Sequence, residues 1–137
     1  GTIDITCDEQ GGCASWIKQA NPKDYERITV SSDGQGSWSN YDENGNLTAI
    51  GVSNVSVLLQ NVQEMLRKQD FSITDCISFA TANPARALGL YPAKGCICVG
   101  GDADLLLFDE DWQLHDVMAN GSWLMRKQKL LKRGTFE

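Results

Sequence analysis

The chain changes character near Gly89. Before this residue, two strand-like segments at residues 2–7 and 27–32 are separated by a segment that contains a short helix, and longer helices follow. After it, short strand-like segments are separated by turn residues. This order is typical of the end of an α/β barrel followed by part of a small β-sandwich. We therefore expect an α/β fold, in which residues 1–90 hold the last strands and helices of a (β/α)8 barrel and residues 91–137 hold a sandwich portion.

The helical part is marked by the spacing of apolar residues and by capping residues. Apolar side chains between Val55 and Leu66 recur at i, i+3, i+4, i+7, i+10 and i+11, which predicts an amphipathic helix. Asn54 stands where it can cap this helix. Ser72, with Asp75 at the third helical position, predicts the start of the next helix.

The segment around Gly89 predicts the end of the helices and the start of the β-rich part. We expect a last short helix with Asn83 as N-cap and Pro84 at its first position, ending at Gly89. Four strands are expected beyond it, at residues 95–99, 103–108, 114–119 and 122–126, with turns at Gly100-Gly101, Glu110-Asp111 and Asn120-Gly121.

Residues 34–53 predict a long polar loop. Loops longer than about 12–15 residues are uncommon in compact domains and are usually functional or disordered. Four apolar or aromatic side chains interrupt this one, which argues for order and for a lid or substrate loop: Trp38, Tyr41, Leu47 and Ile50.

The composition excludes several classes of partner. With 42% hydrophobic and 22% charged residues, the chain is that of a soluble globular protein. The net charge of −6 argues against binding to nucleic acid. No apolar run approaches the roughly 20 residues of a membrane span. Gly1 leads directly into a strand without a signal peptide, so we expect a piece of a longer protein.

The cysteines indicate the redox state of the protein's compartment more than a metal site. The odd number of five, without paired Cys-x-x-Cys motifs, predicts reduced and packed thiols more than a metal site or disulfides, which is typical of a cytoplasmic protein. Cys96 and Cys98 should share one face of a predicted strand. The basic residues between Arg126 and Arg133 predict a solvated face.

Asp33 is the strongest candidate for chemistry. It follows the β-branched run Ile28-Thr29-Val30 and opens the glycine-rich segment of residues 31–37. A rigid strand places a carboxylate firmly, and glycines let a ligand approach closely. From the residues alone, an Asx-type turn remains the alternative interpretation.

Two sets of motifs resemble a known family. Residues 95–105, with Asn83-Pro84-Ala85 and Leu88-Gly89-Leu90 upstream, resemble the C-terminal motif of the amidohydrolase superfamily. Residues 31–37, combined with residues 42–48 and 50–52, resemble the isoaspartyl (β-aspartyl) dipeptidase family more narrowly. That resemblance continues through residues 71–73 to the closing residues 132–137, so the chain looks like the C-terminal third of such an enzyme.

The resemblance implies a site. Enzymes of the family hold two zinc ions bridged by a hydroxide, and Asp33 matches their aspartate, which binds metal and carries the proton from hydroxide to leaving amine. Ser37 matches a serine that contacts the substrate, and Gly34 and Gly36 would turn backbone N–H groups toward it. The other ligands, four histidines and a carboxylated lysine, would lie outside this chain. His115, the only histidine, is expected at a surface or interface.

The implied activity is hydrolysis of the isopeptide bond of β-aspartyl dipeptides by a full-length, homo-oligomeric enzyme, with this chain alone inactive. The alternatives are another amidohydrolase, such as a deacetylase or D-aminoacylase, and a non-catalytic scaffold of the same fold. Ser31, Ser32 and Asp4 are expected to have structural roles, the serines by bonding neighbouring backbone. Because the two N-terminal strands would have unpaired edges, we expect the isolated chain to associate.

Overall fold

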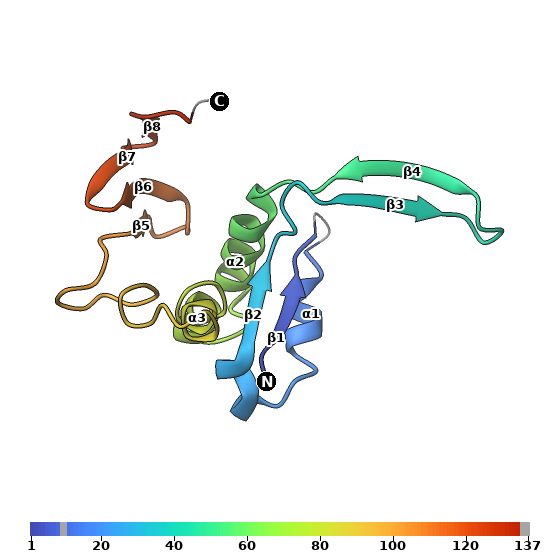
Figure 1. The fold of residues 1–137 in the computed structure, drawn as a ribbon, viewed down its shortest axis with the longest axis horizontal. Helices are drawn as coiled ribbons and strands as arrows, with labels where there is room; N and C mark the ends of the chain where they lie inside the picture. The colour runs from blue at the N-terminus through green and yellow to red at the C-terminus, as the bar shows by residue number, and fades with distance from the viewer. Residues whose placement is uncertain (9–10, 135–137) are drawn as a thin grey trace.

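A computed structural model describes residues 1–8 and 11–134. The last three residues of the family resemblance, 135–137, lie outside the described residues. Figure 1 shows a central body, a hairpin that stands away from it, and a separate C-terminal sheet. The body is built from the first two strands and the helices.

The body begins with a strand–helix–strand unit. Strand β1 (Ile3–Thr6) leads to helix α1 (Cys13–Ile17), 3-10 helix η1 (Pro22–Arg27) and strand β2 (Ile28–Ser31). β1 and β2 pair in parallel from Ile3 beside Ile28 to Thr6 beside Ser31. Parallel pairing needs a crossover connection, which α1 and η1 supply. The two predicted strands and the short helix between them are confirmed.

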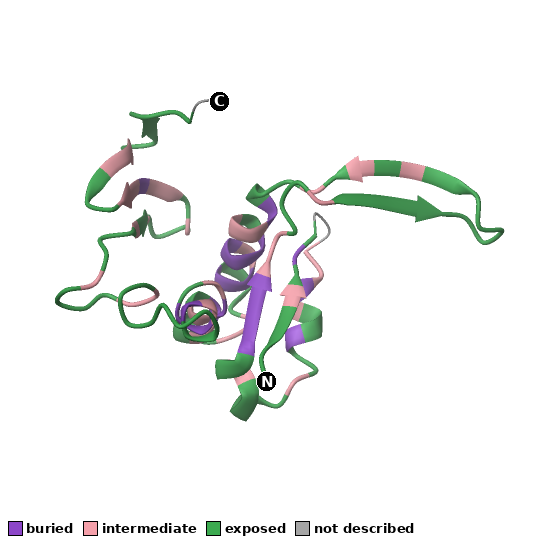
Figure 2. Cartoon of the chain, in the orientation of Figure 1, coloured by how far each residue is buried: buried purple, intermediate pink, exposed green. Residues whose placement is uncertain are grey.

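Three further helices cover one face of this sheet. They are α2 (Ser56–Lys68), α3 (Ile73–Ala80) and α4 (Ala82–Ala87), of which α3 and α4 pack against β2 and α2 packs against α1 and α3. Figure 2 shows the buried residues concentrated on β2 and on the helices beside it. Phe79, fully buried, stacks edge-on with Tyr25 and Phe71 at centroid distances of 5.5 Å. The core therefore lies between β2 and the helices.

The predicted cap of α3 is present, whereas the N-cap position of α2 is Val55 and Asn54 bonds this helix from one residue earlier. Asn54 Oδ1 accepts a hydrogen bond from the Ser56 N–H at 2.9 Å, just before α2. Ser72 Oγ accepts from the Asp75 N–H at 3.1 Å at the start of α3. These bonds satisfy N–H groups that a helix leaves without an internal partner.

The predicted start of the last helix is wrong. α4 begins at Ala82 and contains Asn83, which is buried and does not cap it. The Asn83 side chain instead donates to the carbonyls of Tyr25 at 2.8 Å and Ile28 at 2.7 Å. Asn-Pro is also a cap sequence, and only the tertiary fold shows that this amide bonds the backbone of η1 and of the first residue of β2.

The predicted polar loop is a β-hairpin. β3 (Ser37–Tyr41) and β4 (Leu47–Val52) pair antiparallel, with an irregular register between Asn40 and Tyr41. At the tip, Asp42 Oδ1 accepts from the backbone N–H groups of Asn44 at 2.9 Å and Asn46 at 2.8 Å. The expectation of an ordered segment is confirmed, and the loop assignment is wrong, because a tight turn containing Asn44-Gly45 lets the two flanking segments pair as strands.

The C-terminal sheet is a four-stranded antiparallel meander. Its strands are β5 (Leu105–Phe108), β6 (Leu114–Ala119), β7 (Ser122–Arg126) and the short β8 (Lys129–Leu130). Three of these were predicted, and β8 was not. The strand predicted at residues 95–99 is absent, because the chain there runs through turns, with Gly95 at φ +84° packed against the α4 backbone.

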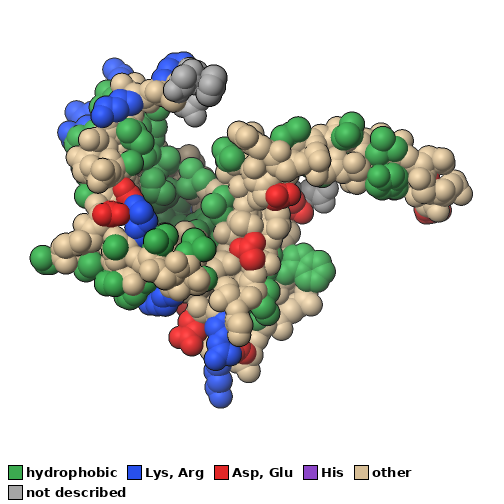
Figure 3. All heavy atoms as spheres, viewed as in Figure 1, with side chains coloured by type: hydrophobic (Ala, Val, Ile, Leu, Met, Phe, Trp, Pro, Cys, Tyr) green, Lys and Arg blue, Asp and Glu red, His purple; other side chains and the backbone are tan. Residues whose placement is uncertain are grey.

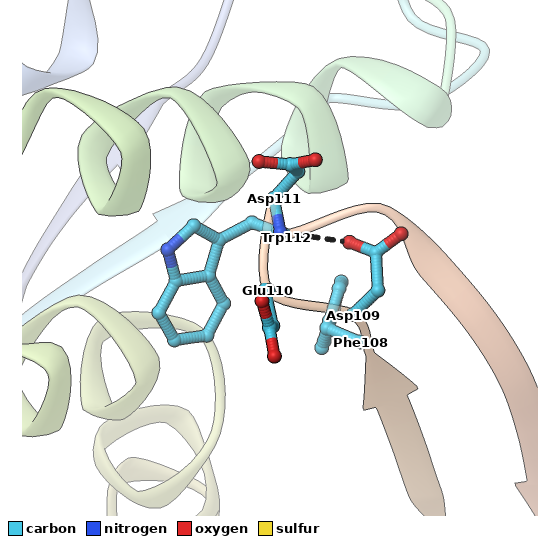
Figure 4. Close-up of a pocket in the computed structure, with 5 residues that line it drawn as sticks. All are labelled: Phe108, Asp109, Glu110, Asp111 and Trp112. Carbon is cyan, nitrogen blue, oxygen red and sulfur yellow. Dashed lines mark hydrogen bonds between the residues drawn. The ribbon is translucent and has the colours of Figure 1, made fainter.

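The turn between β5 and β6 joins the C-terminal sheet to the body. Gln63 Nε2 donates to the Trp112 carbonyl at 2.6 Å, and Arg67 Nε donates to the Asp111 carbonyl at 3.0 Å. Figure 4 shows this turn beneath a helix of the body. Side chains of α2 thus hold the sheet through its backbone.

Candidate functional site

Asp33 lies two residues after the end of β2, at the carboxyl end of the parallel strands. Its backbone adopts φ +46°, and Gln35 follows at φ +69°. A side chain other than glycine in this left-handed region is uncommon, although aspartate tolerates it better than most. Strained backbone of this kind concentrates at functional sites, and the carboxyl ends of barrel strands form the active face of such folds.

The turn after Asp33 is closed by backbone hydrogen bonds. The Gly36 N–H donates to the Asp33 carbonyl at 2.8 Å. The base of the hairpin completes the turn, because the Gln35 N–H donates to the Ser53 carbonyl at 2.9 Å and the Ser53 N–H donates to the Gly36 carbonyl at 2.8 Å. The N–H of Gly36 is therefore already used within the turn.

Both glycines of the turn make room for neighbouring side chains. A Cβ atom at Gly36 would lie closer than 3.0 Å to all three atoms of the Asp33 carboxyl group. A Cβ atom at Gly34 would collide with the Val55 side chain, just before α2. Gly36 thus lets the Asp33 carboxylate lie across the turn, and Gly34 lets the turn approach the helix.

Ser37 begins β3 beside Val52 and is exposed. The four candidate residues from the sequence, Asp33, Gly34, Gly36 and Ser37, consequently stand on one turn between β2 and β3. Their closeness in the sequence already implied this grouping. The fold shows in addition that this turn lies beside the ends of both parallel strands. The Cys7 N–H, just after β1, donates to the carbonyl of Ser31, the last residue of β2, at 2.7 Å.

A polar network beneath the turn was not predicted. Asp4 on β1 accepts hydrogen bonds from the hydroxyls of Thr29 and Ser31 on β2, each at 2.6 Å. Ser31 therefore bonds a side chain across the sheet, and not neighbouring backbone as expected. In both strands, polar residues alternate with apolar ones, which was the available signal for a polar face of the sheet. This pattern does not reveal which residue of one strand lies beside which residue of the other.

The described residues can be tested for their fit to a metal ion. Within the described parts of the chain, no group of three or more His, Cys, Asp or Glu side chains could hold a metal ion. A closed zinc site takes four ligands, so Asp33 fits as one oxygen ligand of a site that other segments would complete. A carboxylate at the carboxyl end of a barrel strand suits this donor role.

His115 lies on β6 in the C-terminal sheet, away from the Asp33 turn in Figure 1. Its Nδ1 is 2.9 Å from Asp116 Oδ2, and Asp116 Oδ1 accepts from the Lys127 N–H at 2.7 Å. The histidine and this N–H lower the pKa of the Asp116 carboxyl group. The half-exposed ring therefore contacts a carboxylate of its own sheet, as expected of a surface histidine.

The five thiols are free in the structure. Cys7, Cys13 and Cys76 are buried, and the Cys13 thiol donates to Asn61 Oδ1 at 3.2 Å. The pKa of the Cys7 thiol is raised above its ordinary value, mainly by a hydrogen bond with Cys13 and also by burial. Cys96 and Cys98 both lie 3.4 Å from the Pro92 carbonyl, so they do share one side of the chain although no strand forms.

Two open hollows occur elsewhere. One, of about 730 Å³, is lined by residues 108–112, whose carboxylates surround the turn between β5 and β6 (Figure 4). The other, of about 490 Å³, follows the free side of β1 and includes Trp16. Neither includes Asp33. Among the described residues, no helix is both long and apolar enough to cross a membrane.

Comparison with known proteins gives the family. The model of the amidohydrolase family matches residues 17–124. A D-hydantoinase of Ralstonia pickettii is 32% identical over 86 residues, which are 58% of this chain and 19% of that protein.

Solved structures extend the match to the whole chain. The crystal structure of a β-aspartyl dipeptidase from Fervidobacterium islandicum AW-1, in complex with β-Asp-Leu dipeptide, matches with a TM-score of 0.82 and 30% identity over 100% of this chain. An N-acetylglucosamine-6-phosphate deacetylase of Thermotoga maritima shares the fold over 91% of this chain, with a TM-score of 0.66 and 19% identity. The chain spans 37% of the dipeptidase and 39% of the deacetylase.

The expected resemblance and the expected fold class, part of an amidohydrolase barrel with a β-rich segment, are confirmed by these matches. The family model begins at the end of α1 and spans η1, β2, the Asp33 turn, the hairpin, helices α2 to α4 and most of the C-terminal sheet. The chain belongs to the amidohydrolase family.

Proposed function

We propose that the complete protein is a metal-dependent hydrolase that cleaves the isopeptide bond of β-aspartyl dipeptides. The observation that carries this proposal is the match to a β-aspartyl dipeptidase over the entire chain, at a TM-score of 0.82. The match includes the turn at Asp33 and the hairpin after it. The strained backbone of Asp33 supports a functional role for its carboxylate.

In this proposal Asp33 is a metal ligand and the catalytic acid–base group. Two zinc ions, when bound, would lower the pKa of a water molecule and polarise the amide carbonyl. An Asp33 carboxylate oxygen takes the proton of the attacking water and returns it to the leaving amine. The turn holds this carboxylate at the end of β2, and the remaining ligands come from segments outside this chain.

Ser37 and the glycines form the substrate side of the proposed site. The Ser37 hydroxyl stands at the start of β3, four residues beyond Asp33, and can donate to a substrate carboxylate. Because the Gly36 N–H is already bonded, the contribution of Gly36 is to leave space beside the Asp33 carboxylate. Gly34 places the turn against α2 and lets its backbone face the ligand.

The proposal extends to organisation and location. We divide the chain at residues 90 and 91, because the body and its core precede this point and the separate four-stranded sheet follows it. We further propose a homo-oligomeric metallopeptidase of the cytoplasm, on the family resemblance and on five unpaired thiols.

The test uses the full-length enzyme loaded with zinc. We expect hydrolysis of β-Asp-Leu, loss of about 10³-fold in kcat for Asp33→Asn, and a raised KM with little change in kcat for Ser37→Ala. Metal content measured in parallel should fall in Asp33→Ala. A Ser56→Ala variant, altered at an exposed residue that begins α2, should behave as the wild type.

A second candidate is hydrolysis of cyclic amides, which the 32% identity to a D-hydantoinase favours. A deacetylase or D-aminoacylase activity and a non-catalytic scaffold are further alternatives. Turnover of a hydantoin or an N-acetylated compound above that of β-Asp-Leu would overturn the dipeptidase assignment. Failure to bind zinc or to hydrolyse any of these substrates would indicate the scaffold.

A further inference from the structure

One face of the β1–β2 sheet is polar. The parallel register sets Asp4 beside Thr29 and Thr6 beside Ser31, so these four side chains share a face. Val30 and its neighbours in register occupy the opposite face, in the core formed with the helices. In a (β/α)8 barrel, the face away from the helices is the barrel interior, which branched apolar residues ordinarily fill. A carboxylate at this place is therefore unusual.

Both oxygens of the Asp4 carboxylate are bonded. Thr29 Oγ1 donates to Oδ1 and Ser31 Oγ donates to Oδ2, each at 2.6 Å. Hydrogen bonds between a hydroxyl and a carboxylate are short and strong because the acceptor is charged. Since each oxygen takes a different hydroxyl, the carboxylate fixes both side chains of β2 with respect to β1.

Ser31 transmits this arrangement to the Asp33 turn. It is the last residue of β2, and its carbonyl accepts from the Cys7 N–H at 2.7 Å. β1 therefore holds Ser31 through its backbone and, by way of Asp4, through its side chain. Asp33 follows two residues later, where the backbone turns to φ +46°. The end of β2 is thus fixed immediately before the turn departs from it.

We propose that Asp4 is a positioning residue for Asp33. By holding Thr29 and Ser31 it sets the end of β2, and with it the place of the Asp33 carboxylate. The inference rests on the proposed function, in which Asp33 is the reacting carboxylate. Asp4 acts through Ser31 and touches neither substrate nor reacting atoms.

The rival explanation is that Asp4 only joins the two strands. If Asp4 only links the strands, loss of its hydrogen bonds would lower the stability of the protein and leave the rate of the chemical step unchanged. A positioning role alters the chemical step, because a displacement of the reacting group of about 1 Å can cost about 10²-fold in rate. Kinetics and stability therefore separate the two explanations.

The experiment compares variants of the zinc-loaded full-length enzyme. Asp4→Asn keeps the size of the side chain but replaces one acceptor oxygen with a donor, and Ser31→Ala removes the donor that faces it. We expect each to lower kcat about 10-fold or more with KM changed less than about two-fold. The double variant should lose no more than either single variant, since both remove the same contact.

Two further variants are controls. Ser31→Thr keeps the hydroxyl and should restore kcat if Ser31→Ala had lowered it. Asp24→Asn changes an exposed carboxylate that lies 3.7 Å from Arg27 Nη1, and it should match the wild type. A lower melting temperature with unchanged kcat in Asp4→Asn and Ser31→Ala, or additive losses in the double variant, would overturn the proposal.

The assay is kept independent of the substrate assignment. Kinetics are measured on whichever of β-Asp-Leu, a hydantoin or an N-acetylated amino sugar phosphate the wild type hydrolyses. If it hydrolyses none, the proposed function has failed, and amide hydrogen exchange decides the inference. Faster exchange of residues 31–36 in Asp4→Asn than in Asp24→Asn then supports positioning, and equal exchange overturns it.

Discussion

At the scale of single residues, the site depends on the absence of one carbon atom. Gly36 has no Cβ, and the Asp33 carboxyl group occupies the place where that atom would be. The neighbouring atoms belong to the end of a side chain, so an alanine can be accommodated if the carboxylate moves. The substitution therefore tests the placement of Asp33 more than the integrity of the turn.

We predict that Gly36→Ala in the full-length enzyme lowers kcat by about 10–10²-fold, because the carboxylate is displaced, with little change in melting temperature. Kinetics and thermal unfolding measure the two effects. Gly12→Ala is the matched control, since a Cβ there would lie at an ordinary 3.7 Å from Asp8 Oδ2. Full activity in Gly36→Ala would contradict the proposed role of Asp33.

Asn61 is the second residue whose loss should be measurable. It is buried in α2, and its Nδ2 donates to the carbonyls of Asp8 and Val57, each at 2.9 Å. We predict that Asn61→Ala destabilises the full-length protein by about 1–3 kcal/mol, because a buried carbonyl loses its donor. Urea unfolding measures the loss. The exposed neighbour Gln60, changed to alanine, should alter stability by less than about 0.5 kcal/mol.

At the scale of elements, an ion-pair cluster joins the end of the helical part to the C-terminal sheet. Lys94 Nζ lies 2.8 Å from Asp102 Oδ2 and also pairs with Asp104, which precedes β5. Asp104 Oδ1 in addition accepts from the Asn120 N–H at 2.7 Å, at the turn between β6 and β7. Lys94 first, and then this N–H, lower the pKa of Asp104 below 3.8.

A pH dependence follows from the direction of that change. A carboxyl group with a lower pKa in the folded state stabilises the fold above its unfolded pKa, and the contribution is lost as the pH falls through the folded pKa. We predict that acidification below pH 3.8 destabilises the sheet through Asp104. Asp104→Asn and Lys94→Met should both flatten this part of a plot of stability against pH. An unchanged slope in both variants would contradict the prediction.

The elements also show what sequence patterns can and cannot predict. The helix between Val55 and Leu66 was predictable because its apolar face recurs over three turns and Asn54, which bonds its first N–H, stands just before it in the sequence. The hairpin was missed because β3 has no buried side chain and therefore no hydrophobic alternation to detect. Residues 95–99 form a short apolar run typical of a strand, yet Ile97 and Val99 are exposed, so no sheet partner selects that conformation in the described structure.

The site was predictable to a similar degree. Asp33 and its glycines could be found because they are consecutive, and the family resemblance gave them roles. Asp4 could not be connected with Ser31, because the contact spans 27 residues and depends on the register of two strands. Asn83 was misassigned for the same reason, since its partners lie 58 and 55 residues away.

At the scale of the whole molecule, hydrophobic surface is left uncovered. Ile3 on β1 is 65% exposed and Trp16 on α1 is 63% exposed. Figure 3 shows further hydrophobic side chains on the hairpin and in the hollow beside the C-terminal sheet. Surfaces of this kind ordinarily face other protein. The edge of β1 also has no strand partner among the described residues.

We predict that residues 1–137 expressed alone associate in solution and do not hydrolyse β-Asp-Leu in the presence of zinc. Exposed edges and apolar faces drive pairing, and in the proposed function most metal ligands lie outside the chain. Light scattering after gel filtration measures association, and an amine-release assay measures activity. A monomer that melts cooperatively would argue against the partial-barrel interpretation, and clear turnover would show that other ligands are unnecessary.

The hairpin has a mechanical consequence for the whole molecule. It extends from the body as an arm, and its base is tied to Gln35 and Gly36 through Ser53 (Figure 1). The base of this arm is therefore the same turn that carries Asp33. A force on the far end of the arm would therefore reach, through these hydrogen bonds, the backbone of the turn that carries the carboxylate.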